Sequence, residues 1–172
     1  MSIETWNERY RSGERGNPKP APAVVEAAAG AVRPGRALDL ACGAGRNALF
    51  LARNGWEVTA VDGSTEAIAI ASKRAGRLGL RIATSVLDLE QLPLPFEDAA
   101  CDLVCIILYL QASLFHEAKR LVRPGGAIVI AAKTAGVFAI QLPQLVEYFH
   151  DDEIVAARTR DETAELIVRR RE

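Results

Sequence analysis

Residues 37–48, Ala-Leu-Asp-Leu-Ala-Cys-Gly-Ala-Gly-Arg-Asn-Ala, combine residue types and spacing that are suited to ligand chemistry. A short apolar run is followed by a turn in which one residue separates Gly43 from Gly45, and a helical pattern begins after the turn. Glycine has no Cβ atom, so such a turn lets backbone N–H groups approach a ligand closely. Asp39 lies in the apolar run, and a carboxylate there favours a ligand with positive charge. The segment therefore predicts a binding turn for a cationic ligand.

The same turn also fits the spacing G-x-G-x-x-G/A of dinucleotide-binding proteins, with Ala48 as the last residue. A pyrophosphate on this helix N-terminus would lie near the Asp39 carboxylate. At an effective dielectric constant of about 20, like charges ~4 Å apart repel by about 4 kcal/mol before screening. The sulfonium and ammonium groups of S-adenosylmethionine (SAM) would be attracted instead. We therefore expect SAM. An NAD-linked oxidoreductase is the alternative, although it also needs a catalytic domain for which the chain leaves no length.

Two further acids follow the next strand-like runs of the sequence. Asp62-Gly63 ends the run 57–61, 17 residues beyond the second glycine, where a carboxylate can accept both ribose hydroxyls of either cofactor. Asp88 ends the third run, where it is placed to accept from an adenine amino group or, alternatively, to cap the following turn. Together with Asp39, these acids predict a crevice for a cationic nucleoside.

Strands and helices must alternate if these acids are to meet at one sheet edge. Strands are predicted over residues 37–41, 57–61, 81–86, 103–108 and 127–132. Helices are predicted over residues 3–12, 20–32, 46–54, 65–78, 112–122 and 141–150, with a loop over 13–19. Apolar runs with little alternation, separated by helices, are typical of a parallel sheet that is covered on both faces. The ligand is expected at the carboxyl ends of the strands, at the topological switch point.

The end of the chain follows a different pattern. Residues 153–158 and 165–168 are predicted strands, and the link Asp161-Glu162-Thr163 is so short that they must pair as an antiparallel hairpin at the sheet edge. The predicted fold is therefore α/β, a Rossmann-like doubly wound sheet of seven strands that is mostly parallel with a C-terminal antiparallel hairpin.

We expect residues 1–172 to form a single domain, since this length suits one substantial core. Within it, residues 1–32 are interpreted as an N-terminal helical cover and residues 36–133 as the cofactor-binding core. Residues 141–172 would add the C-terminal helix and the hairpin.

Composition limits the partners and the location. The formal net charge of −1 provides no global field for nucleic acid or anionic membranes, and 49% hydrophobic with 25% charged residues is ordinary for a globular protein. No apolar run approaches the roughly 20 residues of a membrane helix, and no signal peptide is seen, so a cytoplasmic location is expected. Three cysteines without a C-x-x-C pair and two distant histidines give no reason to expect a metal site.

In order and spacing, residues 36–133 resemble the class I SAM-dependent methyltransferases. The resemblance rests on Asp-Leu-Ala-Cys-Gly-Ala-Gly, Val-Thr-Ala-Val-Asp-Gly-Ser, Leu-Asp-Leu and Leu-Val-Arg-Pro-Gly-Gly. A narrower likeness to the tellurite-resistance and thiopurine methyltransferase branch rests on Trp6-Asn-Glu-Arg-Tyr10 and on Gly-Arg-Asn-Ala-Leu-Phe-Leu-Ala over residues 45–52. In that branch, the aromatic N-terminal segment folds over the cofactor.

The resemblance implies a set of SAM-binding residues, with S-adenosylhomocysteine (SAH) as the product. These residues are Trp6, Tyr10, Asp39, Ala41, Gly43, Gly45, Arg46, Asn47, Asp62, Gly63, Asp88, Leu89 and Ile106. Trp6 and Tyr10 would cover the cofactor, or merely pack their helix onto the core. Arg46 or Asn47 would face the methionine carboxylate, although Arg46 can instead make a surface salt bridge.

Methyl transfer is an in-line displacement on a carbon that the sulfonium already activates, so the reaction needs no obvious triad. The catalytic residues are not identified; weak candidates are Tyr109 after the fourth strand and His116, which acts as a base only if it faces the cleft instead of the helix surface. A small-molecule acceptor is expected, because DNA-type motifs and an RNA-binding module are lacking. The oligomeric state stays open.

The segment after Lys133 departs from the tellurite-resistance pattern. It is short and lacks the basic and histidine residues that would bind an oxyanion, so metalloid and thiopurine acceptors are not favoured. A further alternative is therefore a SAM-binding protein without an acceptor site of its own.

Overall fold

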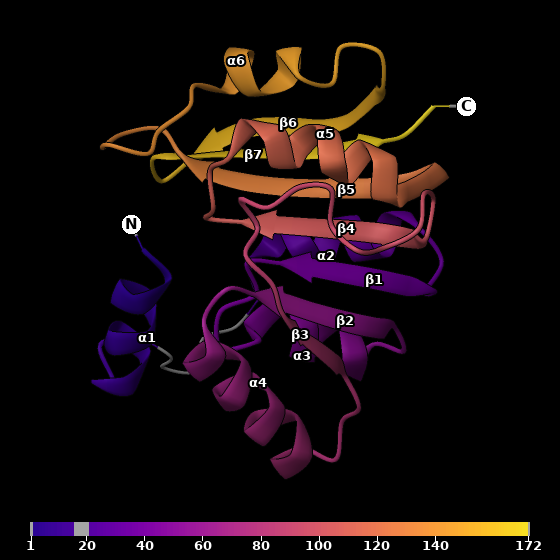
Figure 1. The fold of residues 1–172 in the computed structure, drawn as a ribbon. Helices are drawn as coiled ribbons and strands as arrows, with labels where there is room; N and C mark the ends of the chain where they lie inside the picture. The colour runs from indigo at the N-terminus through magenta and orange to yellow at the C-terminus, as the bar shows by residue number, and fades with distance from the viewer. Residues whose placement is uncertain (1, 16–20, 172) are drawn as a thin grey trace.

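The computed structural model describes residues 2–15 and 21–171, and its elements follow the predicted alternation (Figure 1). The strands are β1 (Arg36–Leu40), β2 (Glu57–Asp62), β3 (Ala83–Val86), β4 (Cys101–Ile107), β5 (Val122–Lys133), β6 (Glu153–Arg160) and β7 (Thr163–Arg169). The helices are α1 (Ile3–Arg11), α2 (Ala23–Ala31), α3 (Arg46–Arg53), α4 (Thr65–Arg77), α5 (Ala112–Leu121) and α6 (Leu142–Glu147). The parts of the predicted loop and second helix that fall on residues 16–20 lie outside the described residues.

The seven strands form one sheet in the order β3-β2-β1-β4-β5-β7-β6. Strands β1 to β5 are parallel, whereas β7 pairs antiparallel with both β5 and β6. The predicted fold class is confirmed. Because the chain order reverses between β1 and β4, the crevice expected for a ligand lies at the carboxyl ends of these two strands.

Helices cover both faces of the sheet, because alternate strand residues point in opposite directions. One core packs α5 and α6 against residues such as Leu40 and Ile106, and Phe115 and Phe149 lie fully buried within it. The other core packs α2, α3 and α4 against the second face, with Leu51 at 0% exposure. Both faces of the central part of the sheet are therefore buried under helices, which explains why central strands such as β4 are largely apolar.

The C-terminal hairpin turns at Asp161 and Glu162, whose φ values are 47° and 54°. Positive φ at both central residues is the geometry of two-residue hairpin turns that match the strand twist. Strand β7, not β6, pairs with β5 and so joins the parallel part of the sheet. Leu166 and Ile167 of β7 enter opposite cores, while β6 is exposed along its whole length at the edge.

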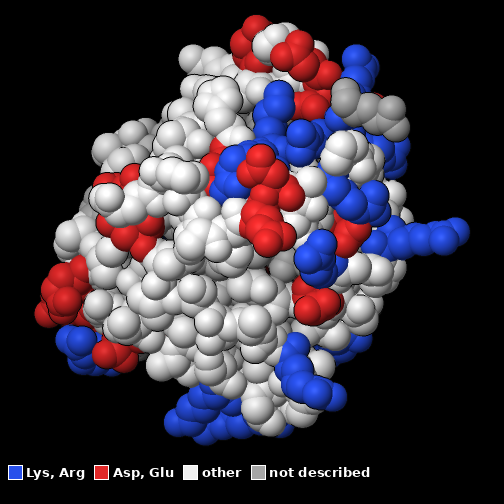
Figure 2. Space-filling view, turned by 45° about the vertical axis from the view of Figure 1, so that its right-hand side comes forward, with Lys and Arg blue, Asp and Glu red and all other residues white. Residues whose placement is uncertain are grey.

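The carboxyl ends of β1 to β5 lie toward the left of Figure 1, and α1 lies further to the left, apart from the other helices. In Figure 2, lysine and arginine side chains are interspersed with aspartate and glutamate on the face that is shown. Ion pairs among the described residues include Lys119 with Asp152 at 2.8 Å and Arg169 with Glu153 at 3.2 Å. None of the helices in residues 2–15 and 21–171 has the length and apolar composition needed to cross a bilayer.

Candidate cofactor site

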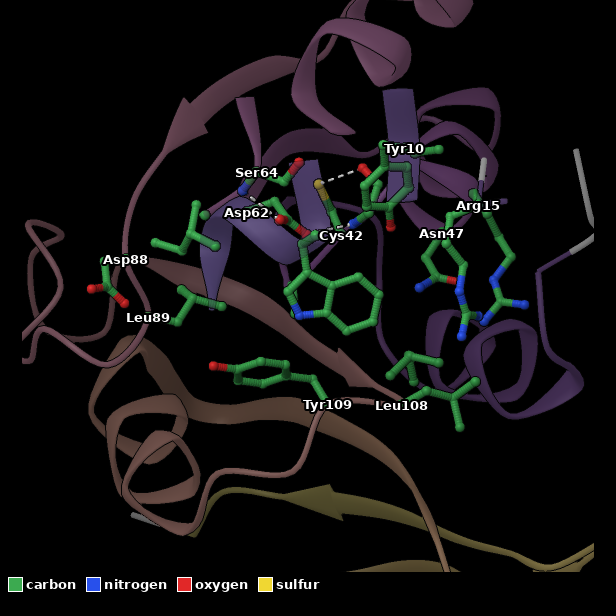
Figure 3. Close-up of a pocket in the computed structure, with 18 of the residues that line it drawn as sticks. Tyr10, Arg15, Cys42, Asn47, Asp62, Ser64, Asp88, Leu89, Leu108 and Tyr109 are labelled. Atoms are coloured by element: carbon green, nitrogen blue, oxygen red, sulfur yellow. Dashed lines mark hydrogen bonds between the residues drawn. The ribbon is translucent and has the colours of Figure 1, made fainter. Parts of the chain in front are cut away.

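A cavity of about 680 Å³ lies at the carboxyl ends of β1, β2 and β4, between the glycine turn, the connection after β3 and helix α1. This volume is in the usual range for small-molecule sites. Figure 3 shows Arg15 and Asn47 toward one end of the cavity, Asp88 and Leu89 toward the other, and Asp62 between them. The cavity thus has a basic end and an acidic end.

The glycine turn wraps tightly at its two glycines. Gly43 and Gly45 have φ values of 54° and 82°, in the left-handed region that favours glycine. A Cβ atom on Gly43 would lie 2.5 Å from the hydroxyl oxygen of Tyr10, so the cover helix approaches the backbone here. A Cβ atom on Gly45 would lie 2.8 Å from the Cβ of Ala71, so Gly45 permits α3 to pack on α4 and does not line the cavity.

Asp39 is fully buried behind the cavity and does not line it. Its carboxylate accepts a hydrogen bond from the Ala48 N–H at 3.0 Å and a weaker one from the Asn47 amide at 3.5 Å. Burial raises the pKa of Asp39 to about 7, although both of these hydrogen bonds act in the opposite direction. Asp39, which was expected to bind the ligand, is therefore not among the lining residues and instead anchors the start of α3.

Asn47 links the buried Asp39 to the cavity, because its amide donates to Asp39 and its side chain lines the cavity. It is 4% exposed and lines the cavity, and its Oδ1 atom has no hydrogen-bond partner among the described residues. A buried acceptor without a partner is costly unless a ligand supplies the donor. Asn47 therefore offers an acceptor for an ammonium or N–H group at the basic end.

Asp62 ends β2 and lines the cavity as expected. Its two oxygens accept hydrogen bonds from the N–H groups of Gly43 and Ser64, both at 2.8 Å. Burial raises the pKa of Asp62, and these two bonds partly oppose that rise. Each carboxylate oxygen retains a further lone pair. Asp62 is therefore held in place by the glycine turn and by the N-cap residue of α4, yet still has acceptor capacity.

Asp88 follows β3, two residues after Val86, which pairs in register with Asp62. Its Oδ1 atom accepts from the Glu90 N–H at 3.0 Å, which is the turn-capping interaction considered from the sequence. Asp88 and Leu89 also line the cavity. Capping and cavity lining are thus combined in one residue.

Helix α1 covers the cavity with Trp6 and Tyr10, whose ring centroids lie 6.3 Å apart. The guanidinium groups of Arg9 and Arg15 lie over the Trp6 ring at 5.2 and 5.8 Å. Burial raises the pKa of Tyr10 to about 12. Both aromatic residues line the cavity and leave part of their surface unburied, so these rings are placed to contact a ligand.

The only buried residue of α1 is Asn7, which is 7% exposed. Its Oδ1 atom accepts from the Ser64 hydroxyl at 2.7 Å, and more weakly from the Thr65 hydroxyl and the Glu66 N–H. Ser64 in turn caps α4 through the Ala67 N–H. Asn7, Ser64, Asp62 and the glycine turn therefore belong to one hydrogen-bond network.

Several predicted residues lie elsewhere. Ile106 points into the α5 core, and its neighbour Ile107 lines the cavity instead, because successive strand residues face opposite sides. His116 is exposed on α5, 5.9 Å from the Tyr148 ring, and is not a cavity residue. The helix-surface alternative therefore describes His116 better than a base at the cleft.

The structure brings the other predicted residues together and adds some that sequence reasoning missed. The predicted residues that line the cavity are Trp6, Tyr10, Ala41, Gly43, Arg46, Asn47, Asp62, Gly63, Asp88, Leu89 and Tyr109. Missed residues include Cys42, Ser64, Arg15, Arg74 and Leu108. Strand alternation and the helix-capping position of Ser64 were available signals, whereas nothing in the sequence pattern places Arg15 or Arg74 here.

Comparison with known proteins places this cavity in a family context. Residues 37–126, more than half of the chain, match a family model described as a methyltransferase domain. The chain is 30% identical over 145 residues to Hemagglutinin 1 of Eikenella corrodens, covering 77% of this chain and 48% of that protein. It is 37% identical over 67 residues to a probable SAM-dependent methyltransferase, TehB, of Haemophilus influenzae, covering 39% of this chain and 23% of TehB. The chain thus spans less than half the length of these relatives.

The crystal structure of TehB from Haemophilus influenzae superposes with a TM-score of 0.80 over 96% of this chain and 67% of that chain. The identity is 23%, so this similarity concerns the fold. Residues 37–126, which match the family model, contain the glycine turn, Asp62 and Asp88. The chain therefore belongs to the methyltransferase domain family, within the class I SAM-dependent methyltransferases.

Proposed function

We propose that this protein binds SAM in the cavity and transfers its methyl group to a small-molecule acceptor by in-line displacement. The observation that carries the proposal is the polarity of the cavity, with cationic residues at one end and Asp62 and Asp88 toward the other. SAM has the complementary distribution, since its carboxylate lies at one end and its adenosine, rich in hydrogen-bond donors, lies at the other. A dinucleotide would place a pyrophosphate near buried carboxylates.

The residues present fit SAM at each of its parts. The carboxylate of Asp62 would accept from the ribose hydroxyls, and Asp88 would accept from the adenine amino group. At the other end, Arg46 would bind the methionine carboxylate, and the unpartnered Oδ1 of Asn47 would accept from the ammonium group. Trp6 and Tyr10 would cover the ligand, because they line the cavity from α1.

When bound, SAM supplies a methyl carbon that its sulfonium activates. The protein then has to orient the cofactor and exclude water, and near-attack positioning accounts for much of the rate in such reactions. Leu108 and Tyr109, which directly follow β4, also line the cavity. Burial raises the pKa of Tyr109 to about 12, so this phenol is protonated and does not serve as a general base near neutral pH. An acceptor that is soft or already ionised suits this arrangement.

A second candidate is a SAM-binding protein without an acceptor site. The short connection after β5 favours it, since the Ile140 N–H bonds back to the Lys133 carbonyl at 2.9 Å and closes residues 134–139 into a small loop. A methyl-transfer screen over thiols, phenols and carboxylates, read out by SAH release, separates the two candidates. SAM binding without SAH release from any acceptor class would favour the second.

The binding half of the proposal is tested by calorimetry with SAM, SAH and NAD. We expect SAM and SAH to bind and NAD not to bind. The Asp62→Ala variant should lose at least about 100-fold in SAM affinity, since two hydrogen bonds to a charged group are worth roughly 1.5–3 kcal/mol each. Glu57→Ala is the matched control, because Glu57 is an exposed acid at the other end of the same strand. Unchanged affinity in Asp62→Ala, or tight binding of NAD, would contradict the proposal.

A further inference from the structure

Gln111 connects two walls of the cavity without lining it. Its Oε1 atom accepts from the Tyr109 hydroxyl at 2.9 Å, and its Nε2 atom donates to the Leu89 carbonyl at 2.8 Å and to the Ser113 hydroxyl at 3.0 Å. Tyr109 follows β4, whereas Leu89 belongs to the connection after β3. Figure 3 shows the Tyr109 hydroxyl directed toward the side of Asp88 and Leu89.

The position of Gln111 in its own helix does not explain this side chain. Gln111 is the N-cap residue of α5, where Ser, Thr, Asp or Asn would satisfy a free N–H, but its side chain makes no capping bond. Leu108, three residues before Gln111, has a φ of 59°, a strained conformation for a non-glycine residue. Departures from local preference of this kind concentrate at functional sites. The Gln111 side chain therefore joins the walls of the cavity instead of capping a free N–H of the helix.

The donors and acceptors in this contact can be assigned in only one way. The Leu89 carbonyl oxygen can only accept, so the NH₂ group of Gln111 must face it. The Gln111 carbonyl oxygen then faces Tyr109 and also only accepts, so the Tyr109 hydroxyl must donate its proton to Gln111. Toward the cavity, the Tyr109 oxygen is left with lone pairs alone.

We propose that Gln111 is a positioning residue of the cofactor site, which holds the Tyr109 hydroxyl as a donor to the protein so that its oxygen presents only an acceptor to the ligand. This inference rests on the proposed function. It implies that the ligand group beside Tyr109 carries an N–H or O–H, and that Tyr109 sets specificity without transferring a proton. It also implies that Gln111 fixes the connection that carries Leu89 and the adenine-binding Asp88.

The test compares SAH and adenosine binding by calorimetry in Gln111→Ala and in the isosteric Gln111→Glu. Gln91→Ala is the matched control, since Gln91 is an exposed glutamine on the same connection as Leu89. We expect Gln111→Ala to weaken SAH and adenosine by the same factor of about tenfold, because the adenosine side is disturbed. Gln91→Ala should bind like the wild type. Thermal melts of each variant without ligand report on folding.

Gln111→Glu supplies a readout that a purely structural role would not change. An ionised glutamate cannot donate to the Leu89 carbonyl, so SAH should bind about as weakly as in Gln111→Ala at about pH 8, and affinity relative to wild type should recover as the pH falls through about 4.3 and the carboxyl gains its proton. Wild-type affinity in Gln111→Glu at about pH 8, or in Gln111→Ala, would overturn the inference. Absence of SAM and SAH binding by the wild-type protein would instead refute the proposed function.

Discussion

At the scale of single residues, the two acids that end β1 and β2 have different tasks. Asp39 is fully buried and bonds to the start of α3, whereas Asp62 lines the cavity and bonds to Gly43 and Ser64. A carboxylate in a dry site favours its protonated form, and a partly solvated one is free to accept from a ligand. The adjacent strand ends thus separate a structural acid from the acid that we propose binds the ligand.

The first prediction concerns the pH dependence of stability that arises from Asp39. Its pKa is raised from 3.8 to about 7 in the folded protein, so folding favours the protonated form. Its contribution to stability should be complete below about pH 4 and lost as the pH rises through about 7, with a total on the order of 4 kcal/mol. Asp39→Asn should remove this part of the slope in denaturant unfolding measured across the pH range.

The control for this experiment is Glu57→Gln, which changes an exposed acid on β2 and should leave the pH slope unaltered. The pKa of Asp62 is also raised by burial, so Asp62 contributes to the pH dependence of the unfolding free energy with the same sign. Any pH dependence that remains in Asp39→Asn would come from Asp62. An equal slope in wild type and Asp39→Asn would show that Asp39 is ionised in the folded protein throughout.

At the scale of elements, helix α1 is attached by polar contacts instead of a packed apolar face. Its only buried residue is Asn7, and its aromatic residues Trp6 and Tyr10 face the cavity. Apolar surface on these rings is therefore available to a ligand. Docking of α1 and binding of a ligand should stabilise each other, because each supplies contacts that the other lacks.

The second prediction is that Asn7→Ala weakens SAH binding by about tenfold, as expected for the loss of about one to two net hydrogen bonds. The dissociation rate, measured by chasing bound SAH with excess SAM, should rise by a similar factor. The unfolding free energy without ligand should change much less, since α1 adds little to the core. Arg11→Ala is the matched control on the same helix, because it removes exposed ion pairs, with Glu66 and with Glu4, which contribute little. Equal dissociation rates in wild type and Asn7→Ala would contradict this coupling.

At the scale of the whole molecule, the C-terminal hairpin completes both cores of the sheet. Leu166 enters the core under α5 and α6, and Ile167 enters the opposite one. Strand β7 also covers the edge of β5 that the parallel part of the sheet would leave open. The cavity lies at the carboxyl ends of β1, β2 and β4, away from the hairpin, so the stability of the cavity should depend on the hairpin through cooperative folding.

The third prediction is that Leu166→Ala lowers the unfolding free energy by about 2–5 kcal/mol, the usual cost of a fully buried leucine. Val155→Ala on the exposed strand β6 should cost much less, since Val155 is 39% exposed. Denaturant curves followed by far-UV circular dichroism and by tryptophan fluorescence should shift together in Leu166→Ala. A shift in one signal alone would show that the hairpin unfolds separately from the rest.

Much of the fold followed from sequence pattern, because period and turn chemistry are local properties. The alternation of apolar runs with helical stretches predicted the parallel sheet, and the short link near residue 161 predicted the hairpin. The predicted bounds of the helices and strands were less accurate. Helix α6 ends at Glu147, although a helix to residue 150 was expected, and β5 begins at Val122 instead of residue 127. Such boundaries depend on pairing with neighbouring strands, which sequence period does not encode.

The sequence by itself determined the family motifs, the order of the strands along the chain and the acids at their carboxyl ends, since covalent order and residue type suffice for these. Only the tertiary structure decided which side chains meet. It buried Asp39 behind Asn47, exchanged Ile106 for Ile107 at the cavity, and brought Asn7 to Ser64 across 57 residues of sequence. It also joined Tyr109 to Leu89 through Gln111. Burial and contact between distant segments arise only when the sheet and helices pack, and these set the pKa of each acid and the direction of each hydrogen bond.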